Sequence, residues 1–358
     1  MKFNKPLSLG ELLSSDQNSF NVVRLAAATS VLISHSYQLL KGASAEPLSW
    51  TSYTLSQQAV NVFFILSGML LSQSIAQNPY WTRFLAARAL RILPGLFVCG
   101  IIVGWIVGPL ATSMSLLEFL TDAHTIFYPI LSVIFFDKAE LHDVFLKSTQ
   151  PGVVNAPLWT IKYELLAYIA FSILTVAGTL RNRVIVLAGC VTFAMLLTIS
   201  EALYPLPAGS FLRFGLCFGL GVAAYQYRSA LPLHASYVAA FLALALVTNG
   251  TFGAPVLSIL FFGYLALYAG NVVIPRFTRF CHRIDLSYGI YLYAWPLQQL
   301  IIEWFGGTIQ VWQHIALSMI ATLPLAFFSW FAVEKPSLAL KTKFGIATRG
   351  QGQGAPPR

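Results

Sequence analysis

Long apolar runs recur along almost the whole chain and are separated by short polar segments. Ten of these runs are close to the ~20 residues that an α-helix needs to cross a bilayer, although one, 211–227, is at the short end. They occupy 20–40, 55–76, 89–111, 158–180, 184–204, 211–227, 233–249, 254–274, 284–304 and 311–333. The pattern predicts an all-α polytopic membrane protein with about ten transmembrane helices.

An eleventh apolar run, 126–136, is much shorter than the others and is flanked by Asp122, His124 and Asp137. Its length favours an interfacial or re-entrant segment over a membrane-spanning helix. The segment 112–157 is therefore predicted to form one long loop on the outer side. Its acidic residues, Asp122, Asp137, Glu140 and Asp143, either help to select a ligand or belong to an ordinary solvated surface.

The composition supports insertion in the membrane, because 57% of the residues are hydrophobic and only 10% are charged, against about 25% charged in soluble domains. With ten spans and both termini in the cytoplasm, most of the 22 Lys and Arg residues fall on the cytoplasmic side. An eleventh span would move every later basic cluster outside. The net charge of +9 thus reflects topology, and no basic face interleaved with aromatic residues indicates nucleic-acid binding.

The domain organisation is simple. Residues 1–340 are expected to form a single membrane domain, and residues 341–358 a disordered cytoplasmic tail, because Gly, Gln, Pro and Arg dominate the end of the chain. The cysteines are scattered, with no spacing typical of a metal or redox site. They are Cys99, Cys190, Cys217 and Cys281.

Arg24 and His35 lie eleven residues apart within one apolar run. That spacing is about three helical turns, so both side chains share a face, roughly 16 Å apart along the axis. Ionisable groups at membrane depth are costly and usually face a cavity or a partner. A lone histidine on an apolar face is often structural, but a neutral imidazole beside a cavity can also accept a proton from a hydroxyl.

A basic cluster follows at Arg83, Arg88 and Arg91, just before Pro94. Arg88 and Arg91 are three apart and share a helix face. The cluster either marks the cytoplasmic end of a span or forms an anion clamp, since guanidinium groups match phosphate oxygens.

Two further segments carry polar and aromatic groups into predicted spans. In the first, 157–164, Glu164 lies about two turns inside the membrane and needs a partner, which is Lys162, His35 or a sugar hydroxyl. Its neighbours Trp159 and Tyr163 suit an interfacial belt or a sugar-stacking platform. The second, 287–296, places Tyr288, Tyr291 and Trp295 on one face, a stripe that serves either packing or a site, and Asp285 is expected to cap this helix.

Taken together, these segments resemble acyltransferase family three, a family of polytopic membrane proteins that acylate sugars. The resemblance covers nearly the whole chain and rests on six motifs in the expected order. The matching segments are Arg24 to His35 (Arg-x10-His), 63–68 (FFxLSG), 88–94 (RxxR with Pro94), 158–164 (LWS-x-x-x-E, with Thr160 in place of Ser), 287–292 (SYGIYL) and 334–336 (E-[RK]-P). One departure is Ala294, where many relatives carry a histidine, which leaves His35 as the only candidate imidazole in the membrane core.

The resemblance implies an O-acyltransferase of the inner, cytoplasmic membrane. The donor would be an acyl-CoA, acetyl-CoA by family default, used as a co-substrate with no tightly bound cofactor. The acceptor would be a carbohydrate hydroxyl in a surface polysaccharide or a lipid-linked oligosaccharide, and the partners would be the lipid bilayer and polysaccharide-assembly proteins. His35 would act as the central acid/base or receive the acyl group, with Glu164 orienting it or stabilising its cation. Donor binding is assigned to Arg24, Arg88 and Arg91, and a substrate cavity to Ser67, Trp159, Tyr163, Tyr288 and Tyr291.

A second function class fits the same intramembrane residues. A transporter or flippase for a lipid-linked sugar also uses Arg, His and Glu side chains along its substrate path. Such proteins often show inverted repeats, and no convincing repeat is visible in this chain.

Overall fold

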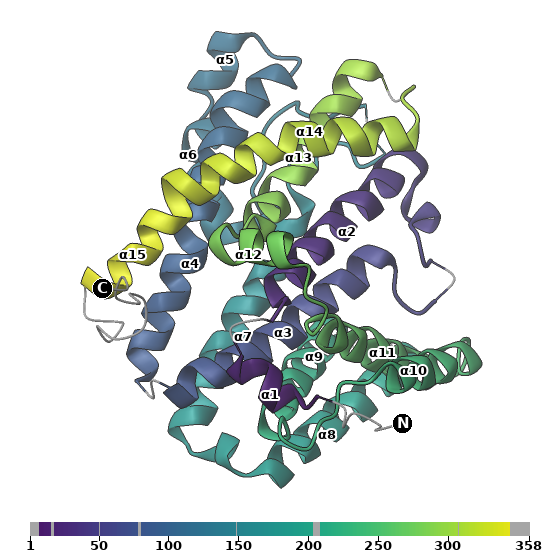
Figure 1. Ribbon diagram of the computed structural model, residues 1–358. Helices are drawn as coiled ribbons and strands as arrows, with labels where there is room; N and C mark the ends of the chain where they lie inside the picture. Colours follow the sequence, from purple (N-terminus) through teal and green to yellow (C-terminus); the bar gives the residue numbers. More distant parts are fainter. Residues whose placement is uncertain are drawn as a thin grey trace.

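The computed structural model of the protein describes residues 7–15, 18–49, 51–77, 80–147, 149–202, 208–306 and 308–343. Every regular element in these residues is a helix, and the only β-type pairings are isolated bridges between Ser8 and Pro232 and between Thr112 and Val144. Figure 1 shows the helices gathered into one bundle. The prediction of an all-α chain is confirmed for the described residues.

The α-helices follow the apolar runs closely. In the first half of the chain they are α1 (Leu9–Ser14), α2 (Phe20–Lys41), α3 (Leu55–Gln77), α4 (Trp81–Ile102), α5 (Leu116–Thr121), α6 (Ala123–Phe135) and α7 (Trp159–Val176). The second half contributes α8 (Arg183–Ala202), α9 (Gly209–Gln226), α10 (Ala235–Val247), α11 (Ala254–Ala269), α12 (Pro275–Arg283), α13 (Ser287–Phe305), α14 (Val311–Phe328) and α15 (Lys335–Lys343). Each of the ten predicted ranges therefore coincides in large part with one helix, although these helices differ in length.

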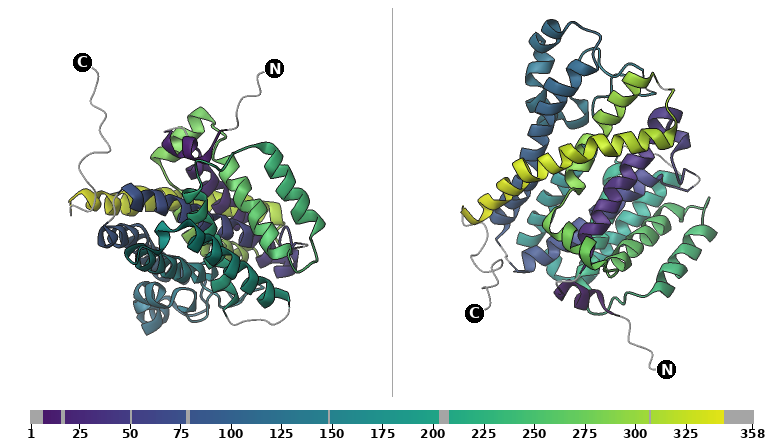
Figure 2. Two further views of the ribbon diagram at one scale, coloured as in Figure 1. Left: turned by 90° about the horizontal axis from the view of Figure 1, so that it is seen from below. Right: turned by 45° about the horizontal axis from the view of Figure 1, so that its top comes forward.

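Two of these helices are extended by π-helical turns. The turn Val103–Val107 continues α4 towards Leu110, and the turn Ser329–Glu334 joins α14 to α15. Figures 1 and 2 show α14 and α15 as one long rod that crosses α4. The predicted tail starts within α15, which ends at Lys343, and residues 344–358 lie outside the described part of the chain.

Five segments of the described chain are long and apolar enough to cross a bilayer. They are Leu55–Gln77, Trp81–Leu110, Ala156–Val176, Arg183–Glu201 and Val311–Lys341. The protein is thus a multi-pass membrane protein. Other predicted spans fold as shorter helices, such as α10 with 13 residues and α11 with 16, so length and composition alone do not establish the predicted total of about ten.

The predicted outer loop 112–157 contains a helix, α6, that packs against α4. Helix α6 has 13 residues, about two thirds of the length of a span. The fit to α4 is close, because a Cβ at Gly100 would lie 2.6 Å from the Ser132 hydroxyl.

Asp122 caps the start of α6. Partial burial raises the pKa of Asp122, but hydrogen bonds from the Thr125 N–H and from His142 outweigh it and lower the pKa overall.

The core of the bundle is the contact between α3 and α9, where two glycines bring the helix backbones together. A Cβ at Gly68 would lie 2.1 Å from the Phe218 carbonyl oxygen, and one at Gly221 would lie 2.0 Å from the Ile65 carbonyl oxygen. Small residues permit such an approach between membrane helices. Gly68 closes the FFxLSG motif, so the last position of that motif has a packing role.

We expect Gly68→Val to destabilise the protein by about 3 kcal/mol, because the new side chain must push the α9 backbone away. The matched control is Gly189→Ala on α8, where an added Cβ has no heavy atom within 4 Å. The measurement is the free energy of unfolding in mixed micelles. Equal stability of the two variants would show that the close contact is not required.

Candidate functional site

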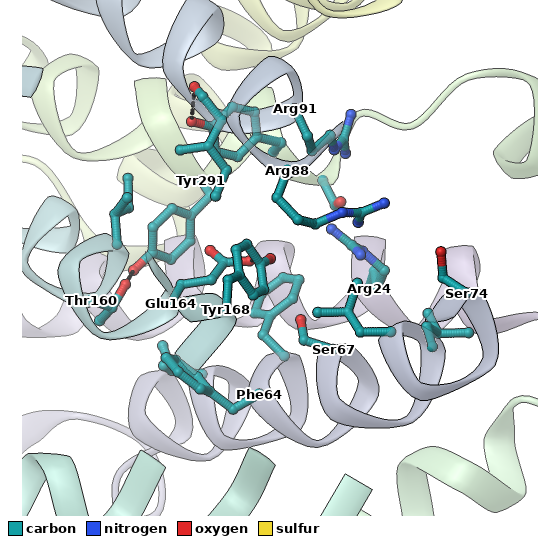
Figure 3. A pocket seen from close by; sticks show the side chains of 18 residues that line it. Arg24, Phe64, Ser67, Ser74, Arg88, Arg91, Thr160, Glu164, Tyr168 and Tyr291 are labelled. Atoms are coloured by element: carbon teal, nitrogen blue, oxygen red, sulfur yellow. Dashed lines mark hydrogen bonds between the residues drawn. The ribbon is translucent and has the colours of Figure 1, made fainter. Parts of the chain in front are cut away.

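Two cavities lie back to back in the middle of the bundle. The first, called here the arginine pocket, has a volume of about 190 Å³ and is lined by residues of α2, α3, α4, α7 and α13, including Arg24, Arg88 and Arg91 (Figure 3). The second, called the histidine pocket, has a volume of about 150 Å³ and contains His35. The face that Arg24 and His35 share on α2 therefore serves two cavities, one for each residue.

The wall between the pockets consists of residues that line both of them, namely Val60, Thr160 and Tyr291. The Thr160 and Tyr291 hydroxyls are 2.5 Å apart, and Tyr291 also donates to the Pro157 carbonyl at 2.7 Å. Thr160 occupies the position of the serine in the family motif and keeps its hydroxyl.

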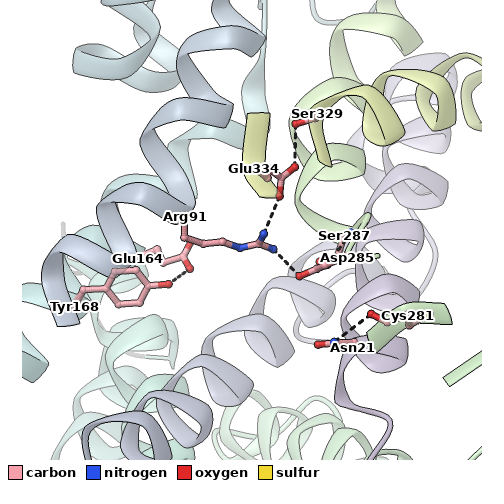
Figure 4. Close-up of polar contacts among 9 residues, drawn as sticks. All are labelled: Asn21, Arg91, Glu164, Tyr168, Cys281, Asp285, Ser287, Ser329 and Glu334. Carbon is pink, nitrogen blue, oxygen red and sulfur yellow. Dashed lines mark hydrogen bonds and ion pairs between the residues drawn. The ribbon is translucent and has the colours of Figure 1, made fainter. Parts of the chain in front are cut away.

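The three arginines of the first pocket are not equivalent. The Arg91 guanidinium forms ion pairs with Asp285 at 2.5 Å and with Glu334 at 2.8 Å (Figure 4). Glu334 is 1% exposed and also accepts a hydrogen bond from Ser329. Arg91 therefore ties α4 to the start of α13 and to the C-terminal rod. Its charge is already neutralised, which argues against the donor-binding role predicted for it.

Arg24 and Arg88 have no such partners. Within the described residues neither guanidinium forms an ion pair, and the buried Nε atom of each lacks a hydrogen-bond partner. Arg24 lies over the Phe63 ring at 5.8 Å and Arg88 over the Phe84 ring at 5.9 Å. Figure 3 shows both side chains directed into the same space. These two cations can receive an anionic ligand.

Glu164 lies in the arginine pocket, not with His35. Its carboxylate accepts a short hydrogen bond from the Tyr168 hydroxyl (Figure 4). Lys162, the other predicted partner, is 3.8 Å from Asp137 instead. No hydrogen bond joins Glu164 to His35, and the two side chains line different cavities. The contact expected between them is therefore not formed in this structure.

His35 faces the second cavity from α2. Its ring meets the Trp295 ring edge-on at 5.0 Å, and its buried Nδ1 atom has no hydrogen-bond partner in the described structure. The carboxylate in the same pocket is Glu46, which is 7% exposed and accepts hydrogen bonds from Ser34 at 2.5 Å and Ser56 at 2.7 Å. The imidazole is thus free to bind a hydroxyl that enters the pocket.

The predicted cavity residues divide between the sites. Ser67 and Tyr288 line the arginine pocket, Trp159 lines the histidine pocket, and Tyr291 lines both. Tyr163 lines neither and faces an apolar groove on the far side of α7. The Tyr288 hydroxyl donates to the Ile92 carbonyl at 2.7 Å, so this part of the stripe also fixes α13 against α4.

The histidine pocket also contains groups that sequence reasoning did not select. Glu46 comes from the connection between α2 and α3, Ser56 and Gln57 come from the first turn of α3, and Arg213 comes from α9. Of the outer loop 112–157, only its end, at Ala156 and Pro157, reaches this pocket. Arg213 could have been selected from the sequence, because it is a charged residue inside the short apolar run 211–227. Glu46 could not, because it lies after the predicted span 20–40 and outside any apolar run.

A second imidazole, His314, lies near the start of α14 and is completely buried. Its Nε2 atom lies 3.0 Å from the Gln298 carbonyl oxygen. His314 lines neither pocket, so its contacts indicate a structural role.

The fold and these cavities define a multi-pass helical membrane protein with a cationic pocket behind a histidine pocket, a pair suited to group transfer. A family model described as an acyltransferase domain matches residues 17–331, so the chain belongs to this acyltransferase family. An "O-acetyl transferase" of Shigella phage Sf6 is 27% identical over 332 residues, which cover 89% of this chain and 95% of the relative. "Nodulation protein 10" of Rhizobium leguminosarum bv. viciae is 28% identical over 364 residues, covering 92% and 95%. No solved structure gives a significant match.

These relationships support an O-acyltransferase. They give no support to the transporter alternative.

Proposed function

We propose that the protein transfers an acyl group, acetyl in the simplest case, from cytoplasmic acyl-CoA to a sugar hydroxyl. The sugar would belong to a surface polysaccharide or a lipid-linked oligosaccharide presented at the outer side of the inner membrane. The observation that carries this proposal is the common wall of Thr160 and Tyr291 between a pocket with two unpaired arginines and a pocket with a histidine.

The arginine pocket is the proposed donor site. Coenzyme A carries several phosphates, and guanidinium groups without internal partners bind phosphate oxygens strongly. Arg24 and Arg88 would hold these phosphates, while Arg91 keeps the pocket in shape through its two carboxylates. In the topology predicted from the positive-inside rule, this pocket would face the cytoplasm, and both termini would lie on that side.

Glu164 would act on the donor side of the wall. It lies one turn after Thr160 on the same face of α7, and its partner Tyr168 lines the same pocket. The carboxylate and the Tyr168 hydroxyl would position the pantetheine arm as it passes towards the wall. This assignment replaces the predicted role of Glu164 in orienting the His35 imidazole, because the two side chains line different cavities.

The chemical step would take place at His35. The imidazole accepts the proton of the sugar hydroxyl as its oxygen attacks the thioester carbonyl. The new C–O bond forms, the C–S bond breaks, and the proton returns from the imidazolium to the departing sulfur of coenzyme A. A variant of the same scheme passes the acyl group through the imidazole itself. In both cases much of the rate enhancement comes from holding donor and acceptor in one dry cavity.

The decisive experiment uses proteoliposomes with a sugar acceptor on one side and radiolabelled acetyl-CoA on the other. Label that appears as an alkali-labile ester on the acceptor establishes acyl transfer across the wall. Acceptor that crosses the membrane without acquiring label would contradict the proposal and revive the transporter alternative.

Arg88→Ala should raise the KM for acyl-CoA by roughly 10- to 100-fold with little change in kcat, because it removes charge-assisted hydrogen bonds to the donor phosphates. The matched control is Arg83→Ala on the same helix, since Arg83 lies over the Tyr80 ring and does not line the pocket. Initial rates at varied acetyl-CoA measure the effect. An equal response of the two variants would refute the donor assignment.

A further inference from the structure

Arg213 is a buried cation that no carboxylate of the described residues contacts directly, and Glu201 attracts it only from beyond ion-pair distance. Its side chain belongs to α9, is 6% exposed and lines the histidine pocket. Among the described residues no carboxylate lies within ion-pair distance of it, and its buried Nε atom has no hydrogen-bond partner. Burial of an unpaired charge is expensive, so a bound anion would remove a substantial cost.

Two acidic side chains of this region, Glu46 in the same pocket and Glu201 near Tyr53, have other hydrogen-bond partners. Glu46 is held by the Ser34 and Ser56 hydroxyls, and Glu201 accepts a hydrogen bond from the Tyr53 hydroxyl at 3.3 Å. The Arg213 guanidinium instead stacks on aromatic rings, 4.5 Å from the Phe214 centroid and 5.0 Å from that of Tyr53. Stacking leaves the edge of the guanidinium, with its N–H donors, available to a ligand.

A large apolar groove begins directly behind the ring on which Arg213 stacks. The groove lies between α7, α8 and α9, has a volume of about 310 Å³, and is lined almost entirely by aliphatic and aromatic side chains with three glycines. Phe214 and Tyr163 form its end wall, with ring centroids 5.3 Å apart. Trp159 contacts both rings from the side of the histidine pocket, so a single aromatic layer separates the groove from that pocket.

The groove opens towards lipid. Three residues of its lining, Leu166, Leu174 and Ile185, are between 40% and 50% exposed on the outer surface of α7 and α8. This apolar groove ends at the Phe214 ring, on which the Arg213 cation stacks. Such an arrangement is complementary to a hydrocarbon chain that carries an anionic head.

We propose that Arg213 binds the phosphate of a lipid-phosphate-linked sugar and that the α7–α9 groove holds its hydrocarbon chain, with the Phe214 ring displaced so that the groove and the histidine pocket connect. The sugar attached to that phosphate would then lie in the histidine pocket with a hydroxyl near His35. This inference rests on the proposed function and specifies the form in which the acceptor is recognised.

The test compares three acceptors that share one sugar: the sugar joined through a phosphodiester to a dodecyl chain, the neutral dodecyl glycoside, and the free sugar. Arg213→Met should raise the KM for the phosphodiester roughly 10- to 100-fold and leave the other two acceptors unchanged. The thermal midpoint of this variant should stay equal or rise, because it removes a buried charge. A purely structural arginine would lower the midpoint and affect all three acceptors.

Binding of the hydrocarbon chain of the acceptor is tested by filling the groove with a larger side chain. Gly189→Phe adds a side chain at a position where an added Cβ has no heavy atom within 4 Å, and it should raise the KM for both dodecyl acceptors by about 10-fold or more. The matched control is Val191→Phe, on the same helix but outside the groove lining and 57% exposed. Equal behaviour of these two variants would overturn the groove assignment.

The outcomes separate this inference from the function on which it rests. Wild-type protein that acylates the free sugar with the same KM as the lipid phosphate would refute the lipid-phosphate site and retain the acyltransferase. Wild-type protein that acylates none of the three, while the phosphodiester protects it from thermal unfolding in an Arg213-dependent way, would retain the binding site and refute the proposed reaction.

Discussion

Replacement of His35 by phenylalanine is expected to lower kcat for acyl transfer by roughly 10²- to 10⁴-fold, the usual contribution of a general base. The physical reason is the loss of the only imidazole that lines either pocket in the described structure. Phenylalanine keeps an aromatic ring against Trp295, which now meets the imidazole edge-on at 5.0 Å. The measurement is the single-turnover rate of ester formation at saturating acetyl-CoA and acceptor.

The same variant should fold as well as the wild type. The His35 Nδ1 atom is buried without a hydrogen-bond partner, so its removal leaves no new unsatisfied group. The control is the thermal midpoint of purified protein, together with the amount inserted in the membrane. His35→Phe that retains full activity would remove the histidine from the mechanism, and the proposed chemistry would need another base.

Replacement of Arg91 by methionine is expected to destabilise the protein by about 3–5 kcal/mol, because the variant leaves two carboxylates in a buried site without their cation. Asp285 and Glu334 belong to segments far apart in the sequence, and the Arg91 guanidinium is the group that joins them. The measurement is the free energy of unfolding in mixed micelles, followed by the yield of folded protein.

A compensated variant separates this structural role from donor binding. Arg91→Met combined with Asp285→Asn and Glu334→Gln removes all three charges and should recover most of the lost stability, since replacing a whole buried ion network is often close to neutral. Arg91→Met with unchanged stability and a raised KM for acyl-CoA would instead restore Arg91 to the donor site.

The contrast between Arg88 and Arg91 shows what a motif cannot reveal. The two residues are three apart, share a helix face and line one pocket, and nothing in their spacing distinguishes them. Their difference depends on two carboxylates, Asp285 just before α13 and Glu334 in the turn that joins α14 to α15. Glu164 gives a similar lesson, because its depth in the membrane showed that it needs a partner, while the partner itself proved to be Tyr168.

The sequence by itself determined the helical class, the positions of the main helices and the residues around which the two pockets are built. It could do so because lipid requires long apolar helices and makes each intramembrane charge conspicuous. Only the tertiary structure decided that His35 and Glu164 occupy different cavities, that Arg91 is neutralised, and that Arg213 lines a polar pocket next to an apolar groove. These features depend on contacts between distant helices, whose relative rotation and separation are set by packing such as that of Gly68 against α9, and no local pattern records them.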